Sequence, residues 1–185
     1  LWVVGGFKIY LGGNDEIVAK MQEVFSYTGA RQFDVEFMER VYKQKFEVVA
    51  CKFDEVPASV EASIPAGGHL AGNRIGFDAG GSDRKVSAVV NGEVIHSEEV
   101  VWFPKTNSDP EYHYQGILDS FRRAAEKMPS VDAIGVSSAG IYIDNEVRVA
   151  SLFIKVPQDE FDAKVVDMYI RAAKEYGDVP LTVAN

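Results

Sequence analysis

Five residues that lie close together in the sequence have the types that phosphate chemistry needs: Asp78, Gly80, Gly81, Ser82 and Lys85. The two glycines have no Cβ atom, so their backbone N–H groups can approach a phosphate closely. Ser82 adds a hydroxyl donor, and Lys85 adds a positive charge. Asp78 can hold Mg²⁺ through water, since this cation prefers oxygen ligands. We therefore predict a phosphate site; the alternative is a tight hairpin whose glycines serve a turn that needs positive φ.

A second set of candidates follows two apolar, strand-like runs. Ser138 and Gly140 lie in the loop after residues 133–137, and Asn185 follows residues 179–183. Loops at the carboxyl ends of strands are where α/β folds place ligands, and an amide side chain can bond to hydroxyl groups in both directions. These residues are candidates for binding a hydroxylated ligand. The alternatives are that the loop has small residues for packing and that the asparagine binds no ligand.

Other kinds of site are disfavoured by what the sequence lacks. Neither Gly-x-x-x-x-Gly-Lys-Ser/Thr nor a helix-opening Gly-x-Gly-x-x-Gly occurs, which speaks against a P-loop NTPase and a Rossmann dehydrogenase. Ser137 has no evident His and Asp partners, so a serine hydrolase is disfavoured. The single cysteine, Cys51, cannot complete a zinc site of known spacing. We interpret His69, His96 and His113 as ordinary polar residues.

The composition describes a globular and acidic chain, with 46% hydrophobic residues and 19 basic against 28 acidic residues, a net charge of −9. This charge argues against nucleic acid as a partner, although it allows a local phosphate site. No apolar run approaches the ~18 residues of a spanning helix, so no membrane partner is predicted. One cysteine cannot form an internal disulfide, so we expect a reducing, cytoplasmic setting.

The apolar pattern predicts two parts, residues 1–73 and residues 74–185. The first is an N-terminal α/β extension and linker, with helices after Asn14 and from Asp34, a strand over 47–53, and then a stretch rich in Pro and Gly. The elements expected in the second are strands over 74–77, 85–90 and 93–102, a helix over 111–127, strands over 133–137 and 147–150, a helix over 161–176 and a strand over 179–183. This order predicts an α/β fold with a mixed sheet and flanking helices.

Three segments, taken in order, resemble the ROK-type sugar kinases (repressor, open reading frame, kinase), which belong with hexokinases and actin-like ATPases. Residues 75–86 resemble the family's first phosphate motif, and residues 133–144 resemble a strand and loop that end in an acid. Residues 179–185 resemble the strand that leads into the family's Asn-Asp pair. The likeness covers about residues 74–185. It implies an RNase H-like (actin-like ATPase) amino-terminal lobe, truncated at its C-terminal end.

The resemblance implies binding of ATP, Mg²⁺ and a sugar, with phosphoryl transfer to a sugar hydroxyl as in hexokinase and glucokinase. It places the following residues at the ligands: Asp78, Gly80, Gly81 and Ser82 at the phosphates with Lys85 nearby, Asp78 at Mg²⁺ through water, and Ser138, Gly140 and Asn185 at the sugar. In the family, the general base is the Asp that follows the Asn matched here by Asn185; the sequence ends before that position, so we expect no catalytic residue and no activity in this fragment. A second phosphate motif and the zinc cluster of many ROK members would also lie beyond the end. A homodimer is one oligomeric state that the sequence leaves open.

Two departures from the family keep other functions open. The loop over residues 137–140 is Ser-Ser-Ala-Gly, where ROK kinases usually carry a proline, and the likeness leaves the first seventy residues unexplained. The alternatives are a non-catalytic actin-like binding or regulatory module and an ATPase of the BadF type, which hydrolyses ATP without a sugar acceptor. A ROK-type repressor is disfavoured because the first region lacks a helix-turn-helix with a basic recognition helix.

Overall fold

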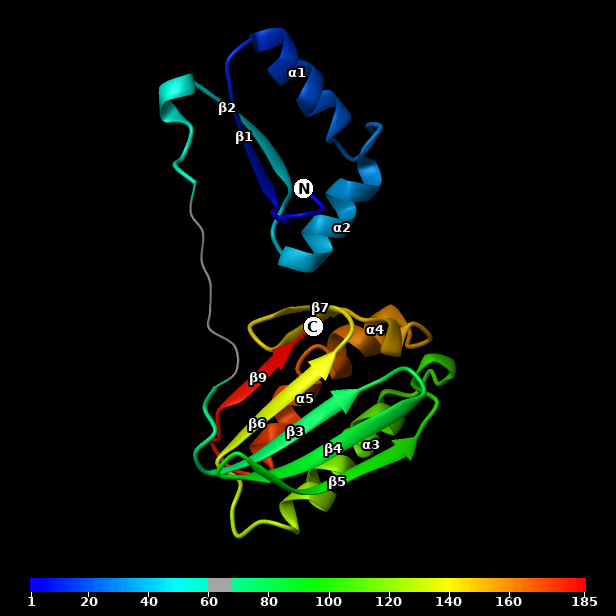
Figure 1. The fold of residues 1–185 in the computed structure, drawn as a ribbon. Helices are drawn as coiled ribbons and strands as arrows, with labels where there is room; N and C mark the ends of the chain where they lie inside the picture. Colours follow the sequence, from blue (N-terminus) through cyan, green and yellow to red (C-terminus); the bar gives the residue numbers. More distant parts are fainter. Residues whose placement is uncertain (60–67) are drawn as a thin grey trace. The chain divides into compact units, whose positions relative to one another are not determined.

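The computed structural model describes residues 1–59 and 68–185. The chain divides into two compact units, Leu1–Ala66 and Gly67–Asn185, each of which is described by itself (Figure 1). Pro65 and Gly67, which belong to the predicted linker, lie outside the described residues. No helix within the described ranges is long and apolar enough to cross a membrane.

The first unit is a two-stranded parallel sheet packed against two helices. Its elements are β1 (Lys8–Gly12), α1 (Asp15–Val24), α2 (Gln32–Tyr42), β2 (Glu47–Cys51) and the 3-10 turn η1 (Phe53–Glu55). The side chain of Asn14 accepts hydrogen bonds from the first turn of α1 and so determines where that helix begins. Val35, Met38 and Phe46 form the buried core of the unit. The two helices and β2 agree with the sequence prediction, whereas β1 has no counterpart in it.

The second unit is built on a five-stranded mixed sheet in the order β5-β4-β3-β6-β9. Its strands are β3 (Asn73–Ala79), β4 (Asp83–Val90), β5 (Glu93–Val101), β6 (Ala133–Ser138) and β9 (Leu181–Ala184). β4 is antiparallel to both its neighbours, while β3, β6 and β9 are parallel. Three strands in hairpin order are thus extended by two parallel strands. This arrangement confirms the predicted RNase H-like mixed sheet.

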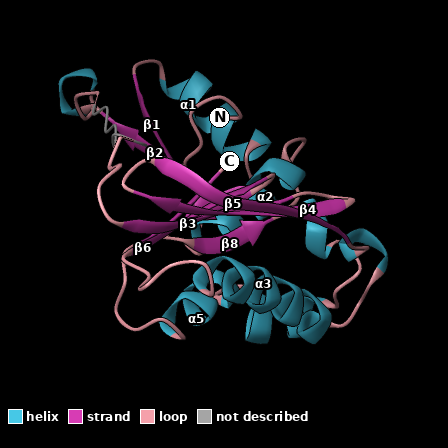
Figure 2. Cartoon of the chain, turned by 60° about the horizontal axis from the view of Figure 1, so that its bottom comes forward, coloured by secondary structure: helices cyan, strands magenta, loops and turns pink. Residues whose placement is uncertain are grey.

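Two helices of this unit lie on the same face of the sheet, as Figure 2 shows for α3 (Pro110–Ala125) and α5 (Met168–Lys174). The residues buried between sheet and helices come from alternate strand positions, because successive side chains of a strand point to opposite faces. They include Ile75, Phe77, Val86, Val136 and Val183 from the strands, and Ile117, Phe121, Met168 and Ala172 from the helices. The intervening strand positions, such as Gly76, Asp78 and Ser137, therefore lie on the other face.

The connections of this unit add short elements. They are the 3-10 turns η2 (Pro104–Thr106) and η3 (Ser151–Phe153), and the hairpin strands β7 (Ile141–Ile143) and β8 (Glu146–Val149). β8 corresponds to the strand expected over 147–150, whereas β7 was not predicted. Buried Arg84 ties the sheet to α3, because its guanidinium donates to Asp119 and Ser120, each at 2.7 Å.

One predicted helix is interrupted. In place of a continuous helix over 161–176, the structure has α4 (Gln158–Glu160), the π-helical segment η4 (Phe161–Val165) and α5. The carbonyl oxygen of Val166 accepts a hydrogen bond from the backbone N–H of Val147 in β8 at 2.9 Å. The N–H of Val166 bonds to Phe161, five residues back, at 3.2 Å. The prediction of one helix was wrong because the bond between Val166 and β8 interrupts the regular hydrogen bonds of a helix.

Candidate functional site

The carboxyl ends of β3, β6 and β9 meet at one edge of the sheet (Figure 1). Asp78 is paired in register with Lys85 on one side and with Ser137 on the other. Ser137 is in turn paired with Ala184, the last residue before Asn185. Residues directly opposite each other on neighbouring strands share a face. The structure therefore brings the predicted phosphate residues and the predicted hydroxyl-binding residues to the same edge.

The turn between β3 and β4 consists of Gly80, Gly81 and Ser82. Neither glycine has a positive φ, so the alternative of glycines needed for a positive-φ turn is wrong. A Cβ atom on Gly80 would instead lie 2.5 Å from the backbone oxygen of Asp83. The indole N–H of Trp102 donates to the carbonyl of Gly80 at 2.8 Å and so helps to hold the turn. Position 80 therefore requires glycine because there is no space for a side chain.

The charge of Lys85 is compensated by two neighbouring carboxylates. Its ammonium lies 2.6 Å from the carboxylate of Asp83 and 3.8 Å from that of Glu99. The hydrogen bond from Lys85 holds the pKa of the Asp83 carboxyl below its usual value, and a second bond, from Ser82, acts in the same direction. The same hydrogen bond to Asp83 raises the pKa of Lys85. Lys85 and the Ser82 hydroxyl, both expected at a phosphate, are thus both engaged with Asp83.

A second lysine, which the motif did not indicate, lies against the turn. A Cβ atom built on Gly81 would be 2.6 Å from the Nζ atom of Lys105 and 2.7 Å from its Cε atom. Lys105 is exposed and belongs to η2, the segment directly after β5. It is more than twenty residues from Gly81 in the sequence. Only the folded connection between β5 and α3 reveals this neighbour.

The sugar-side candidates divide between two environments. The side chain of Asn185 donates to the carbonyl of Gly140 at 3.0 Å, so these two residues are adjacent. Ser138 is only 2% exposed, and its hydroxyl donates to the carbonyl of Ala79 at 3.4 Å. Ser137 is exposed on the opposite face. Ser138 therefore links the ends of β6 and β3, while Gly140 and Asn185 stay at the rim.

The β7–β8 hairpin holds this rim in place. Its turn residues Asp144 and Asn145 both have positive φ, at 54° and 64°, as a two-residue type I′ turn requires. The side chain of Asn145 donates to the carbonyl of Leu181 at 3.1 Å and accepts from the N–H of Val183 at 2.8 Å. These two bonds occupy the outer edge of β9. The strand that carries Asn185 is thereby fixed beside the hairpin.

The polar groups at this edge allow one mode of Mg²⁺ binding. The described residues contain no group of three or more His, Cys, Asp and Glu side chains that could hold a metal. Asp78 is half-buried at the end of β3, whereas the neighbouring Asp83 carboxylate is taken up by Lys85. A single carboxylate suits Mg²⁺, which keeps several waters and takes further ligands from substrate phosphates. The residues present fit Mg²⁺ held by Asp78 through water and not a cation enclosed by protein ligands.

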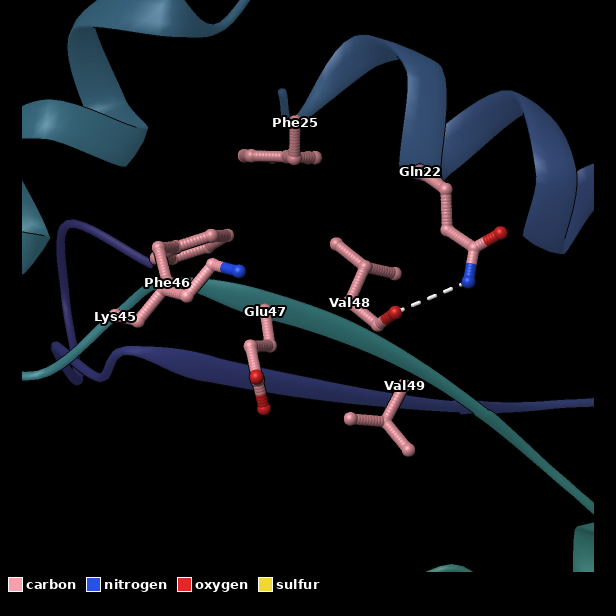
Figure 3. A pocket seen from close by; sticks show the side chains of 7 residues that line it. All are labelled: Gln22, Phe25, Lys45, Phe46, Glu47, Val48 and Val49. Atoms are coloured by element: carbon pink, nitrogen blue, oxygen red, sulfur yellow. Dashed lines mark hydrogen bonds between the residues drawn. The ribbon is translucent and has the colours of Figure 1, made fainter. Parts of the chain in front are cut away.

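A cavity of about 400 Å³ lies in the first unit, between α1 and β2 (Figure 3). It is lined by Gln22, Phe25, Lys45, Phe46, Glu47, Val48 and Val49. The amide of Gln22 donates to the carbonyl of Val48 at 3.1 Å, as the dashed line in Figure 3 shows. None of the residues predicted to act on a ligand lines this cavity. We therefore place the candidate site at the sheet edge of the second unit, where those residues converge.

Comparison with solved structures finds similar folds in proteins of more than one activity. The chain is similar to glucokinase from Parabacteroides distasonis, with a TM-score of 0.46 and 15% identity over 63% of this chain and 31% of that one. It is also similar to the ROK hexokinase from Thermus thermophilus, with a TM-score of 0.36 and 14% identity over 61% of this chain and 35% of that one. RuvC from Thermus thermophilus has a TM-score of 0.36 and 19% identity, over 60% of this chain and 63% of RuvC.

The chain thus spans about a third of the two sugar kinases. No family model matches the sequence, and no curated protein matches it. Sugar kinases, one of them a ROK hexokinase, are among the solved structures that the chain resembles. At these identities and TM-scores the likeness assigns no activity.

Proposed function

We propose that the second unit binds ATP and a sugar, as one lobe of an enzyme that transfers the γ-phosphoryl group of ATP to a sugar hydroxyl. The observation that carries this proposal is the convergence at one sheet edge of two kinds of group. The glycine turn and Asp78 suit a phosphate, and Asn185 beside Gly140 suits a hydroxylated ligand. Phosphoryl transfer requires these two ligands to meet.

On the phosphate side, the proposed work is charge compensation and positioning, since phosphoryl transfer needs little covalent chemistry from the protein. The N–H groups of Gly80 and Gly81 contact phosphate oxygens, and Ser82 donates its hydroxyl when it turns away from Asp83. Lys85 lies close by and keeps Asp83 neutralised. Mg²⁺, when bound, would offset the charge on the phosphates, and Asp78 would hold it through water.

On the sugar side, Gly140 and Asn185 border the acceptor, and Ser138 ties the end of β6 to Ala79 at the end of β3. Glycine at position 140 is required for lack of space, because a Cβ atom there would lie 2.5 Å from the carbonyl oxygen of Val149. The general base that the family resemblance implies, an Asp directly after Asn185, would take the proton of the attacking hydroxyl. Sequencing the natural reading frame past the codon for Asn185 tests for this Asp.

The proposal is tested by replacing Asp78 in the natural protein that contains this chain. Asp78→Ala should abolish sugar-dependent release of ADP, because the variant loses its link to Mg²⁺ and the phosphates. Asp178→Ala is the matched control, since Asp178 is exposed and precedes β9 at the opposite edge of the sheet. Wild-type activity in the Asp78 variant would overturn the proposal.

Two further outcomes identify the alternatives. Release of ADP that is independent of every hexose tested would indicate an ATPase of the BadF type. Calorimetric binding of nucleotide or hexose without any turnover would indicate a non-catalytic actin-like module. Binding of neither ligand would exclude a sugar kinase.

A further inference from the structure

We propose that Lys105 supplies the cation that pairs with the nucleotide phosphate at the Gly80–Ser82 turn. The inference rests on the proposed function and adds a binding residue to it. Lys85 is the lysine that the motif indicates, but the structure places the ammonium group of Lys105, from elsewhere in the chain, against the same turn.

The position of Lys105 is defined by its closeness to Gly81. A methyl group on Gly81 would overlap the last two atoms of the lysine side chain, at 2.6 Å from Nζ and 2.7 Å from Cε. Gly81 and Lys105 are both exposed. The ammonium therefore lies at the exposed surface of the turn, within reach of a phosphate bound there. Glycine at position 81 therefore leaves room for the lysine side chain; it is not needed for a positive φ.

The backbone just before Lys105 is anchored by hydrogen bonds. Trp102 is joined to the turn twice, by its indole N–H to Gly80 at 2.8 Å and by its backbone N–H to Ser82 at 3.1 Å. The backbone N–H of Phe103 donates to the hydroxyl of Tyr112 at 2.9 Å. The start of η2 is thus fixed to the turn that Lys105 contacts and, through Tyr112, to α3. A ligand can then be met by a lysine whose base is already in place, which lowers the ordering cost of binding.

The local charges favour Lys105 over the other cations of this edge. Lys85 is 2.6 Å from Asp83, and the guanidinium of Arg84 is buried and paired with Asp119 at 2.7 Å. Lys105 makes no ion pair with any residue in the described ranges 1–59 and 68–185. The chain has a net charge of −9, so a polyphosphate needs a local positive group at its site. Of the two lysines at this turn, Lys85 is paired with a carboxylate, whereas Lys105 has no such partner among the residues that the structure describes.

The experiment uses Mg²⁺-tripolyphosphate as the probe, titrated into the chain by calorimetry and followed by the NMR amide signals of Gly80 and Gly81. Lys105→Met should weaken binding about tenfold, because one charge-assisted contact is lost. Lys105→Arg should restore binding to within about threefold of the wild type. Lys127→Met is the matched control, since Lys127 is exposed and follows α3 at the opposite edge of the sheet.

A charge contact also predicts a salt dependence that a structural role would not produce. The difference between the wild type and Lys105→Met should shrink as the salt concentration rises, because an exposed ion pair is screened. Thermal unfolding of the variant should match that of the wild type.

The outcomes separate this inference from the proposed function. If the probe shifts the Gly80 and Gly81 signals but Lys105→Met binds as tightly as the wild type, the role of Lys105 is overturned and the phosphate site stands. If Lys105→Met loses affinity but the natural protein releases no ADP with any sugar, Lys105 stands and the kinase proposal fails. If the wild type does not bind the probe, both fail.

Discussion

Two hairpin turns lie at the opposite ends of β4, and both contain glycine. At the β4–β5 turn, Asn91 and Gly92 have φ values of 50° and 86°, the left-handed pair that a two-residue type I′ hairpin requires. At the β3–β4 turn, Gly80 and Gly81 have no positive φ, and their missing side chains instead leave room for Asp83 and Lys105. The first turn uses glycine for its backbone angle and the second for the space around it.

The surroundings of the two turns differ in the same way. The β3–β4 turn is bordered by Asp78, Asp83, Lys85 and Lys105, so it is surrounded by charge. The β4–β5 turn makes a hydrogen bond of 2.8 Å from Asn91 to Gly72 and lies close to Leu70, two neutral contacts, and Glu93 is the charged residue that flanks it. A turn that serves only the chain reversal needs no charged neighbours. The comparison therefore supports our proposal that the β3–β4 turn binds a ligand, whereas the β4–β5 turn serves the chain reversal.

Gly80→Ala should have the largest effect. The new Cβ atom would lie 2.5 Å from the backbone oxygen of Asp83, and a backbone atom cannot move aside without reshaping the turn. We expect unfolding to require about 1–3 kcal/mol less free energy, as for other overpacked sites. We also expect the affinity for Mg²⁺-tripolyphosphate to fall about tenfold or more, because the N–H groups lose their alignment. Urea unfolding and calorimetry measure the two quantities. Retained affinity would mean that the turn does not bind phosphate.

Gly92→Ala should affect stability alone. An alanine at a φ of 86° is strained, and the left-handed region costs a residue with a Cβ atom about 1–2 kcal/mol. The new methyl group would also lie 3.3 Å from the Cβ atom of Leu70. We expect a lower urea midpoint and unchanged binding of the probe. A loss of affinity in this variant would remove the distinction between the two turns.

The two turns also show what the sequence can predict. The Asn91-Gly92 dipeptide between two strands is a local signal, and the predicted hairpin is present. Asp78 and the two glycines are also close in sequence, and the strand pattern predicts that they lie at the edge where β3 ends. The order of the elements predicts a mixed sheet with flanking helices, and the family resemblance implies its RNase H-like form; both are confirmed.

Features that depend on contacts between distant residues were not predictable. Lys105 reaches the turn through the path of η2. The bond between Val147 and Val166 interrupts a helix whose apolar pattern is continuous. β1 finds its parallel partner β2 only across both helices of the first unit. In each case a tertiary contact, and not local propensity, determines the result.

Gly81→Ala should have a smaller effect than either substitution above. The atoms in its way belong to the flexible end of Lys105, which can move into solvent. We therefore expect an unchanged urea midpoint and an affinity for Mg²⁺-tripolyphosphate that falls about threefold, because the ammonium is displaced but not removed. The double variant with Lys105→Met should bind no more weakly than Lys105→Met alone. An additive loss would show that Gly81 acts independently of the lysine.

The smallest effect is a dependence of stability on pH at the charged turn. The pKa of Asp83 is lowered by its hydrogen bonds from Lys85 and Ser82, so its contribution to stability is fully present above the pKa of the unfolded chain and is lost as the pH falls through the lower folded pKa. The thermal midpoint of Asp83→Asn should therefore lie slightly below that of the wild type at neutral pH. The two midpoints should converge as the solution is made acidic. The effect is small because the pair is exposed and screened.

Gly92→Ala provides the contrast for this measurement, because its strain involves no titrating group. Its deficit in thermal midpoint should stay constant over the pH range in which the deficit of Asp83→Asn disappears. If both deficits disappear together, the acid transition is a property of the whole unit. If only that of Asp83→Asn disappears, the carboxylate and Lys85 form a local pair at the phosphate-side turn. Lys85 is then held by Asp83 at neutral pH, which leaves Lys105 as the cation for an incoming phosphate.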